Sequence, residues 1–192
     1  MTITIVKEKS FYFLLPLYKS FLFYFVKFKP SSNLTPQTKL VIKGLNIKNR
    51  RKRITYVYDK CCDIIENQEK GQNVCGFVNK QCFKQRVENK GEMYGCCSPL
   101  CVTENGCTTK NLSCKLIFCK EAKEKYKVLE YKDLILLKLL SLKNRLIVWS
   151  DFYSTREEVL GDLYCYTITF TLYRIAFRRI KKLLLKFRNN NG

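Results

Sequence analysis

The chain has 192 residues, enough for one ordinary domain or for a small cross-linked module with helical extensions, and short for two full domains. Its hydrophobic content of 46% argues against a wholly disordered chain, and its net charge of +20 points to phosphate-bearing partners, with biased codon usage as the alternative. With 11 Cys and no His, the sequence excludes Cys/His zinc fingers and every nucleophile that depends on a His base.

The first predicted element is an apolar, aromatic segment within residues 1–29. Residues 11–28 are fewer than the roughly 20 that a membrane-spanning helix needs, and Lys19 would lie at their centre. Lysines flank the segment, and no small-residue cleavage site follows it, which disfavours a secretory signal. The pattern predicts a segment that lies along a membrane interface, and a helix or strand pair packed on the rest of the protein is the alternative.

Residues 30–58 are predicted to form a basic linker. Pro, Ser, Asn and Thr dominate residues 30–38, where they favour turns and mark a boundary. No acidic residue occurs between Glu8 and Asp59, and the linker ends in a cationic cluster that resembles a nucleic-acid or nuclear-localisation patch. The candidate anion contacts in this cluster are Arg50, Arg51, Lys52 and Arg53.

Residues 59–120 form a cysteine-rich segment. Ten of the 11 Cys lie here, with glycines and turn formers between them. Such a composition cannot supply a large apolar core, so we predict a small irregular module whose fold depends on bound metal or on disulfides, flanked by α-helices. The ten residues are Cys61, Cys62, Cys75, Cys82, Cys96, Cys97, Cys101, Cys107, Cys114 and Cys119.

The spacing of these thiols favours zinc over the other cross-links. A tetrahedral site needs ligand pairs from tight turns, and the best set is Cys97, Cys101, Cys114 and Cys119. Cys61 or Cys62 could form a second set with Cys75, Cys82 and either Cys96 or Cys107. An iron–sulfur cluster ranks below zinc because the two-residue gaps of ferredoxins are missing, and disulfides remain the third alternative. Cys165, outside the cluster, is predicted to be a buried thiol.

Residues 95–119 carry a family resemblance. The segment contains a paired Cys, then Cys101, then Asn105-Gly106-Cys107, then Cys114-Lys115-Leu116. This order resembles the pattern of bacterial cysteine-cluster proteins described as zinc- or iron-chelating, and also that of small cysteine-rich proteins of low-GC bacteria. The chain lacks the Arg-Pro and the upstream Cys-x-x-Cys of that pattern. The resemblance implies metal chelation.

Residues 121–188 are predicted to form two amphipathic helices that pair as a hairpin. Apolar residues spaced by three and four predict one helix over 121–149. Ser154 and Glu157 have the spacing of a capping box that would open a second helix. Its apolar seam runs in steps of four and three from Val159 to Phe187; a strand over 164–173 is the alternative, and residues 189–192 are expected to be a disordered tail.

The second helix also carries the second group of candidate anion contacts, Arg178, Arg179, Lys181 and Lys182. Its apolar seam could pack within the hairpin, against a helix of another protein, or on a lipid surface with the cations at the headgroups. The two groups of cations have two candidate binding partners, an anionic membrane surface and nucleic acid.

Together these features predict a non-enzymatic, thiolate-ligated metal-binding protein, in the cytoplasm or on the inner face of a membrane. The alternatives are a secreted or surface-anchored disulfide-rich binding protein and a nucleic-acid-binding protein. No catalytic motif and no small-molecule substrate site is recognisable, so an enzyme is the least supported class.

Overall fold

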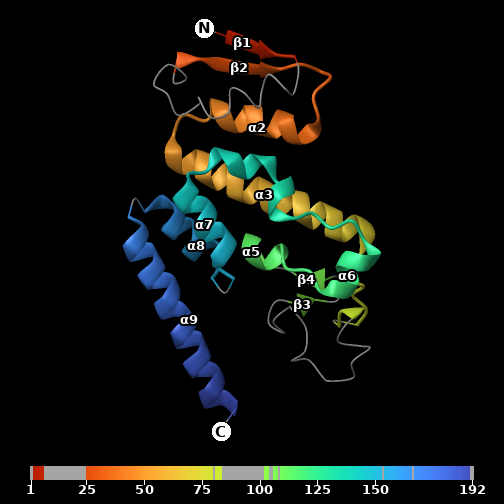
Figure 1. Cartoon of the computed structure of the whole chain (residues 1–192), viewed down its shortest axis with the longest axis vertical. Helices are drawn as coiled ribbons and strands as arrows, with labels where there is room; N and C mark the ends of the chain where they lie inside the picture. The colour runs from red at the N-terminus through yellow and green to blue at the C-terminus, as the bar shows by residue number, and fades with distance from the viewer. Residues whose placement is uncertain are drawn as a thin grey trace.

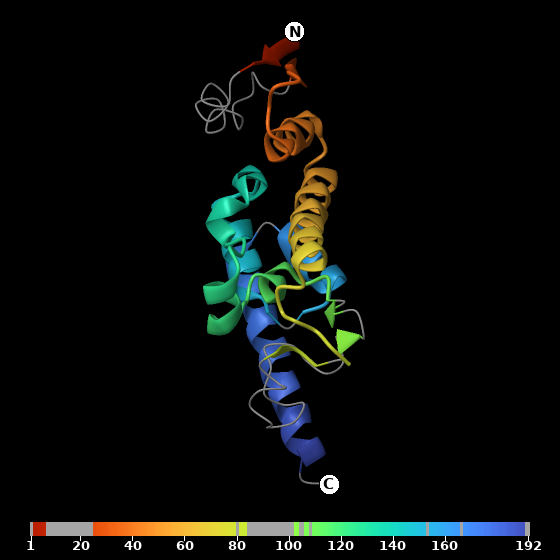
Figure 2. The same cartoon turned by 90° about the vertical axis from the view of Figure 1, so that its right-hand side faces the viewer.

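The computed structural model describes residues 2–6, 25–79, 81–83, 102–103, 106–107, 109–152, 154–165 and 167–190 of the chain. Most of these residues are helical, which confirms the helical character predicted beside the cysteine-rich segment. A small sheet lies at one end of the molecule and the C-terminal helix ends at the other, as both views show (Figures 1 and 2). Metal or disulfide dependence of the fold stays a prediction.

The small sheet consists of two parallel strands, β1 (Thr2–Ile5) and β2 (Lys27–Pro30). Ile5 and Phe28 are both buried in the hydrophobic core. The Asn46 side chain accepts from the Phe28 amide at 2.9 Å and donates to its carbonyl at 2.8 Å. This end of the predicted interfacial segment therefore packs on the protein, whereas residues 7–24 of that segment lie outside the described residues.

The predicted linker contains a complete helix, α2 (Pro36–Asn46). Thr35 is its N-cap, and its side chain accepts from the Thr38 amide at 3.3 Å. Pro36 occupies the first helical position, where the missing N–H costs no hydrogen bond. The expectation of turns throughout residues 30–38 is therefore wrong from Pro36 onward, because the same Thr-Pro pair that breaks a helix interior is a good helix start.

Helix α3 (Arg50–Gln72) joins the predicted linker to the predicted cysteine-rich module. Asn49 caps it by accepting from the Lys52 amide at 3.0 Å, and it ends at Asn73 in the left-handed conformation. Because this helix runs without interruption through residues 59–72, the expectation of an irregular module is wrong for that part.

Short strands and short helices follow between residues 102 and 125. The short strands β3 (Val102–Thr103) and β4 (Gly106–Cys107) pair antiparallel, and the short helices α5 (Leu112–Lys115) and α6 (Lys120–Lys125) follow. Asn111 caps α5 by accepting from the Cys114 amide at 2.9 Å. The side-chain amide of Asn111 donates to the Asp151 and Ser154 carbonyls at 2.7 and 2.9 Å, which ties α5 to a distant loop.

The single helix predicted over residues 121–149 is wrong. The structure has α6, then two 3₁₀ turns, η4 (Tyr131–Asp133) and η5 (Ile135–Leu139), and then helix α7 (Leu142–Ser150). Leucines on several sides of η5 are buried, which a helix with a single apolar face could not achieve. Ser141 then caps α7 by accepting from the Asn144 amide at 3.2 Å.

The predicted second helix is divided into α8 (Arg156–Tyr164) and α9 (Ile168–Asn190). A capping box does open α8, but it uses Thr155 and Glu158, one residue later than expected, because Ser154 donates to the Asp151 carboxylate instead. Cys165 is extended and ends α8, so the expected two-helix hairpin is wrong and the strand alternative is also wrong from Ile168 onward. Helix α9 includes Asn189 and Asn190, part of the predicted tail.

The hydrophobic core is assembled from distant parts of the sequence. Leucines of the η5 segment pack between α2 and α3, and Leu112 of α5 and Leu163 of α8 are fully buried beside them. Gly44 of α2 permits this close packing, since a Cβ there would lie 2.6 Å from the Leu139 side chain. The core therefore includes residues of α3 that belong to the predicted cysteine-rich segment.

Candidate functional site

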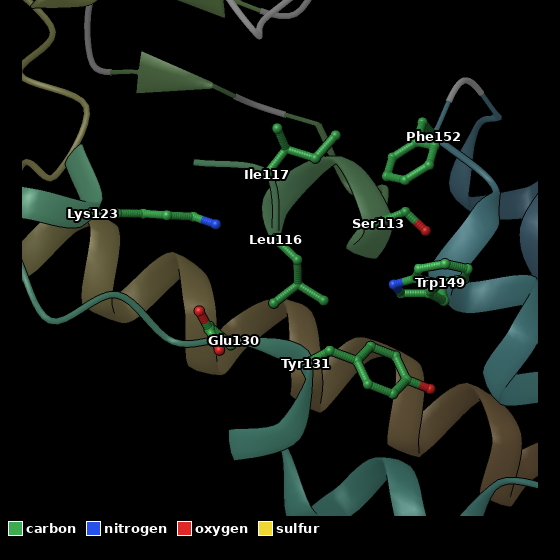
Figure 3. A pocket seen from close by; sticks show the side chains of 8 residues that line it. All are labelled: Ser113, Leu116, Ile117, Lys123, Glu130, Tyr131, Trp149 and Phe152. Carbon is green, nitrogen blue, oxygen red and sulfur yellow. The ribbon is translucent and has the colours of Figure 1, made fainter. Parts of the chain in front are cut away.

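A cavity of about 240 Å³ lies between α5, η4 and α7 (Figure 3). Its walls are mainly apolar and aromatic, with Tyr131, Trp149 and Phe152 among them, and Lys123 and Glu130 lie on one side. The Ser113 hydroxyl donates to the Val148 carbonyl and the Tyr131 hydroxyl to the Arg145 carbonyl. Because both hydroxyls hold elements together, the cavity offers an apolar contact surface rather than an arrangement for acid–base chemistry.

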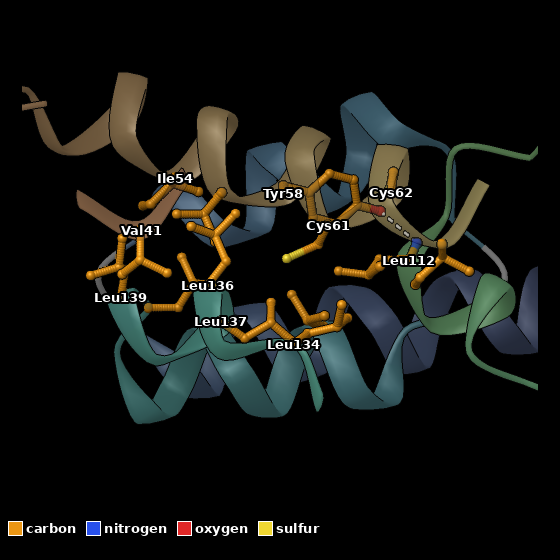
Figure 4. Close-up of a cluster of buried hydrophobic side chains, with 14 of the residues drawn as sticks. Val41, Ile54, Tyr58, Cys61, Cys62, Leu112, Leu134, Leu136, Leu137 and Leu139 are labelled. Carbon is orange, nitrogen blue, oxygen red and sulfur yellow. Dashed lines mark hydrogen bonds between the residues drawn. The ribbon is translucent and has the colours of Figure 1, made fainter. Parts of the chain in front are cut away.

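Cys61 and Cys62 are part of the core on α3 (Figure 4). Burial raises the pKa of both thiols, that of Cys62 to about 12 even though Lys115 acts in the opposite direction. The Cys62 thiol lies 3.6 Å from the Lys110 carbonyl, to which it donates. A metal ligand must be a thiolate, so the surroundings of these two residues favour a packing role over ligation.

The other predicted ligands that the structure describes come from separate segments of the chain. Cys75 and Cys82 follow α3, where the Phe83 amide donates to the Cys75 carbonyl at 3.0 Å. Cys114 lies in α5 and Cys119 is the N-cap of α6, both partly exposed, and Cys107 lies in β4. Cys96, Cys97 and Cys101 lie outside the described residues. The best predicted set is thus half described, and it stays a prediction.

Among the residues that the structure describes, no group of three or more Cys, Asp or Glu side chains is placed to hold a metal ion. The carboxylates near the first cysteines are engaged in ion pairs. Asp59 accepts two hydrogen bonds of 2.7 Å from Arg156, Asp63 pairs with Lys60, and Glu66 pairs with Lys110 at 2.6 Å. Asp59 and Glu66 therefore connect α3 to its neighbours, whereas the Asp63 pair lies within α3.

The basic cluster at the start of α3 is used mostly within the protein. Arg50 donates to the carbonyls of Tyr164 and Leu163 at 2.8 and 3.1 Å, at the C-terminal end of α8 where a cation is favoured. Arg53 donates to the Ile47 carbonyl, and Arg51 lies 5.6 Å from the centre of the Tyr164 ring. Lys52 is the remaining member of this group. Its side chain is exposed, and among the described residues it makes no hydrogen bond to a carbonyl and no ring contact of the kinds just named.

The basic residues of α9 are divided between two roles. Arg178 pairs with both Asp151 and Asp162, and Arg179 donates to the Ser150 carbonyl. Lys181 is exposed to solvent, and the Lys182 side chain lies outside what the structure describes. Two of the four predicted anion contacts on α9 thus hold the helix against the body of the protein.

The acidic side of this attachment is buried. Asp162 is fully buried and also pairs with Arg174 at 3.2 Å, and Asp151 is almost fully buried. Burial raises the pKa of the Asp151 carboxyl, although the hydrogen bond from Ser154 and the charge of Arg178 act in the opposite direction. Burial lowers the pKa of Arg178, but its hydrogen bond to Asp162 and the charges of both acids raise it overall. A charged Arg178 is therefore held between two carboxylates.

The predicted apolar seam of the second helix divides at the break. Val159 and Leu163 on α8 are buried in the core, whereas the seam residues of α9 from Phe170 to Leu184 point into solvent. We call these exposed side chains the α9 seam; each is 56–69% exposed, and they are Phe170, Tyr173, Phe177, Ile180 and Leu184. The opposite side of α9, with Thr171 and Ile175, is buried.

Cations border the α9 seam. Successive helical residues are about 100° apart, so Arg174 and Lys181 lie at one edge of the seam, and Arg179 lies beyond its other edge, past Leu172. The guanidinium of Arg174 is 5.9 Å from the centre of the Phe170 ring. Residues 163–192 contain seven Lys or Arg and no acid. The exposed face of α9 is therefore apolar at its centre and positive at its rim.

In the described part of the chain, we find no helix with the length and apolarity needed to cross a membrane. Comparison with protein-family models, curated proteins and solved structures found no match to this chain. The function must therefore be argued from the residues themselves.

Two features of this region were not anticipated from the sequence. The buried pair Asp151 and Asp162 had one visible signal, because Asp162 is the last acid before a long cationic stretch that needs counter-charges. Asn111, which links α5 to the 151–154 loop, had none, since an Asn between turn formers is ordinary.

Proposed function

We propose that the protein binds an anionic membrane surface peripherally, with α9 lying along the headgroup region. The observation that carries this proposal is the α9 seam, five large apolar side chains at helical spacing that all face solvent. Soluble proteins seldom leave such a continuous apolar face uncovered unless it contacts a partner. In an interfacial helix the apolar face enters the boundary between headgroups and acyl chains to a depth of about 5–10 Å.

The charges of α9 favour lipid as the partner. Lys181 at the rim is exposed and can reach anionic headgroups while its aliphatic stem stays beside the apolar face, whereas Arg174 is partly exposed and also pairs with Asp162. Each Lys or Arg near such a surface contributes on the order of 1 kcal/mol. A second copy of α9 would instead place two cationic helices side by side, and nucleic acid would neutralise the cations but leave the apolar side chains without a partner.

Co-sedimentation with vesicles tests this proposal. Wild-type protein is expected to bind vesicles that contain phosphatidylserine and not vesicles of phosphatidylcholine alone. Replacing two members of the seam, with Phe177→Ser and Ile180→Ser together, should weaken binding at least about tenfold through lost apolar burial. Val78→Ser is the matched control, since Val78 is also exposed but lies far along the chain from α9.

Three outcomes would contradict it. Equal binding to neutral vesicles would remove the role of the cations. Unchanged binding by the double variant would remove the role of the α9 seam. Binding to duplex DNA that is as sensitive to the double variant as to salt would assign the face to nucleic acid instead.

A thiolate metal centre, with zinc preferred over an iron–sulfur cluster, is a separate proposal that comes from the sequence. Its support is the spacing of Cys97, Cys101, Cys114 and Cys119, together with the partial exposure of the last two on neighbouring short helices. Elemental analysis of protein purified under reducing, anaerobic conditions is expected to find zinc, and Cys114→Ser should lower the content while Cys61→Ser should not. Oxidised thiols and no metal would favour the disulfide alternative.

A further inference from the structure

A second exposed apolar stripe lies on α7. Leu142, Leu146 and Trp149 are spaced by four and three residues, so they share one face of this helix, and Trp149 is 64% exposed. The opposite face, with Asn144, Ile147 and Val148, is buried in the body of the protein. Residues 142–150 contain Lys143 and Arg145 and no acid, so this helix has the same sign of charge as α9.

Three interactions fix α7 against the first half of α9. Lys143 donates to the Cys165 carbonyl just before α9 begins, and Arg179 of α9 donates to the Ser150 carbonyl where α7 ends. Arg178 pairs with Asp151, the residue that follows α7. Lys143 and Ser150 of α7 meet Cys165 and Arg179 in the same order along the chain, so α7 and α9 run in roughly the same direction and are joined through these side chains.

The exposed faces of the two helices adjoin. Arg179, which contacts α7, lies on the same side of α9 as Leu172, seven residues earlier, and Leu172 is itself exposed. From Leu172 the apolar surface of α9 continues around the helix to the α9 seam. On α7, Leu142 and Trp149 are next in sequence to Lys143 and Ser150, the two residues that meet α9. The exposed apolar residues of α7 and α9 therefore form one surface. Lys143 and Arg179, which donate to backbone carbonyls, lie between the two helices.

We infer that the lipid-facing surface extends from α9 onto α7, with Trp149 as an interfacial anchor. This inference rests on the proposed function and adds the orientation of the protein at the membrane. Trp is the side chain most suited to the boundary between headgroups and hydrocarbon, where its ring is partly apolar and its N–H remains hydrated. With two parallel helices in contact with lipid, the body of the protein is held in one orientation rather than turning about α9.

Trp149 is the single Trp of the chain, so its fluorescence reports this contact without background. On addition of phosphatidylserine-containing vesicles, the emission of Trp149 should shift to shorter wavelength and its quenching by iodide should fall several-fold. Lipids brominated near the headgroup end of their acyl chains should quench Trp149. Leu146→Ser should reduce both the shift and the vesicle affinity, with Val78→Ser as the control.

The outcomes separate this inference from the proposed function. Failure of the wild-type protein to co-sediment would overturn the proposed function, and the inference with it. Vesicle binding with unchanged Trp149 emission, unchanged iodide quenching and no quenching by brominated lipid would overturn the inference alone and limit the contact to α9. A blue shift that depends on protein concentration in the absence of vesicles would assign the surface to a second copy, which also overturns it.

Discussion

Helices α3 and α9 are equally long, with 23 residues each, and each carries a dense cluster of Lys and Arg, yet they have opposite relations to solvent. The apolar face of α3 is covered by η5, α5 and α8, whereas the α9 seam is uncovered. The difference lies in what surrounds the helices. The chain wraps the leucine-rich η5 segment over α3, and the corresponding face of α9 has no such cover among the described residues.

The cations of the two helices differ in the same way. Those of α3 lie at its N-terminus, where the helix dipole disfavours positive charge, and Arg50 offsets this by contacting the C-terminal carbonyls of α8. Those of α9 run from Arg174 to Arg188, and Lys186 and Arg188 lie in its last turns, where the dipole favours cations. A similar composition therefore serves internal attachment in α3, and in α9 it is divided between attachment by Arg178 and Arg179 and an exposed cation at Lys181.

Replacing a matched isoleucine in each helix gives the largest contrast. Ile65→Ala on α3 removes a fully buried side chain and should lower the free energy of unfolding by about 3 kcal/mol, because it leaves a cavity. Ile180→Ala on α9 removes a side chain that is 57% exposed and should change stability by less than about 0.5 kcal/mol. Urea unfolding measures both, and a comparable cost for the two variants would show that the α9 seam is covered in solution.

Removing the buried acid that anchors α9 should have a slightly smaller effect. Asp162→Asn keeps the shape but leaves Arg178 with one counter-charge in place of two, which we expect to cost about 2–3 kcal/mol in urea unfolding. Glu157→Gln is the control because its carboxylate is largely exposed beside Arg156, and it should cost less than about 1 kcal/mol. Equal effects would mean that the ion pairs with Asp162 do not hold α9.

The local features of the structure could be predicted well from the sequence. Which apolar faces are covered by other parts of the chain could not. The helical content, the spacing of the α9 seam and the presence of a cap near residue 154 were all visible in short windows. Whether Leu163 would be buried and Phe177 exposed was not, because both lie on one periodic seam and only the neighbours distinguish them. Periodicity shows which residues share a face and does not show what lies against it.

The candidate site shows the same limit. A cluster of cysteines suggested one site, but Cys61 and Cys62 are taken into the core by α3, which begins at an Asn cap that resembled a linker residue. The basic residues suggested two anion-binding arms, and Arg50, Arg178 and Arg179 instead bind carbonyls and carboxylates that lie 16 to 114 residues away in sequence. Such long-range partners cannot be predicted from spacing.

The pH dependence of stability should test whether the Cys62 thiol on α3 is buried in solution. The pKa of Cys62 is about 12 in the folded protein and 9.0 ordinarily, so the unfolded chain loses this proton first as the pH rises. The stabilising contribution is complete below about pH 9 and declines toward pH 12, by up to about 1.4 kcal/mol per pH unit. The difference in unfolding free energy between wild type and Cys62→Ala should therefore shrink over that range, and a constant difference would place the thiol in contact with solvent.

The smallest expected effect concerns the cationic start of α3. Arg50→Gln removes two hydrogen bonds to the carbonyls that end α8 and should lower the free energy of unfolding by about 1 kcal/mol. Lys52→Gln, two residues along the same helix, removes an exposed cation next to an unfavourable dipole end and should leave stability unchanged or raise it by a few tenths of a kcal/mol. If Lys52→Gln weakens vesicle binding as strongly as Lys181→Gln does, then the cations of α3 also face the membrane, and the division of roles between the two helices would have to be abandoned.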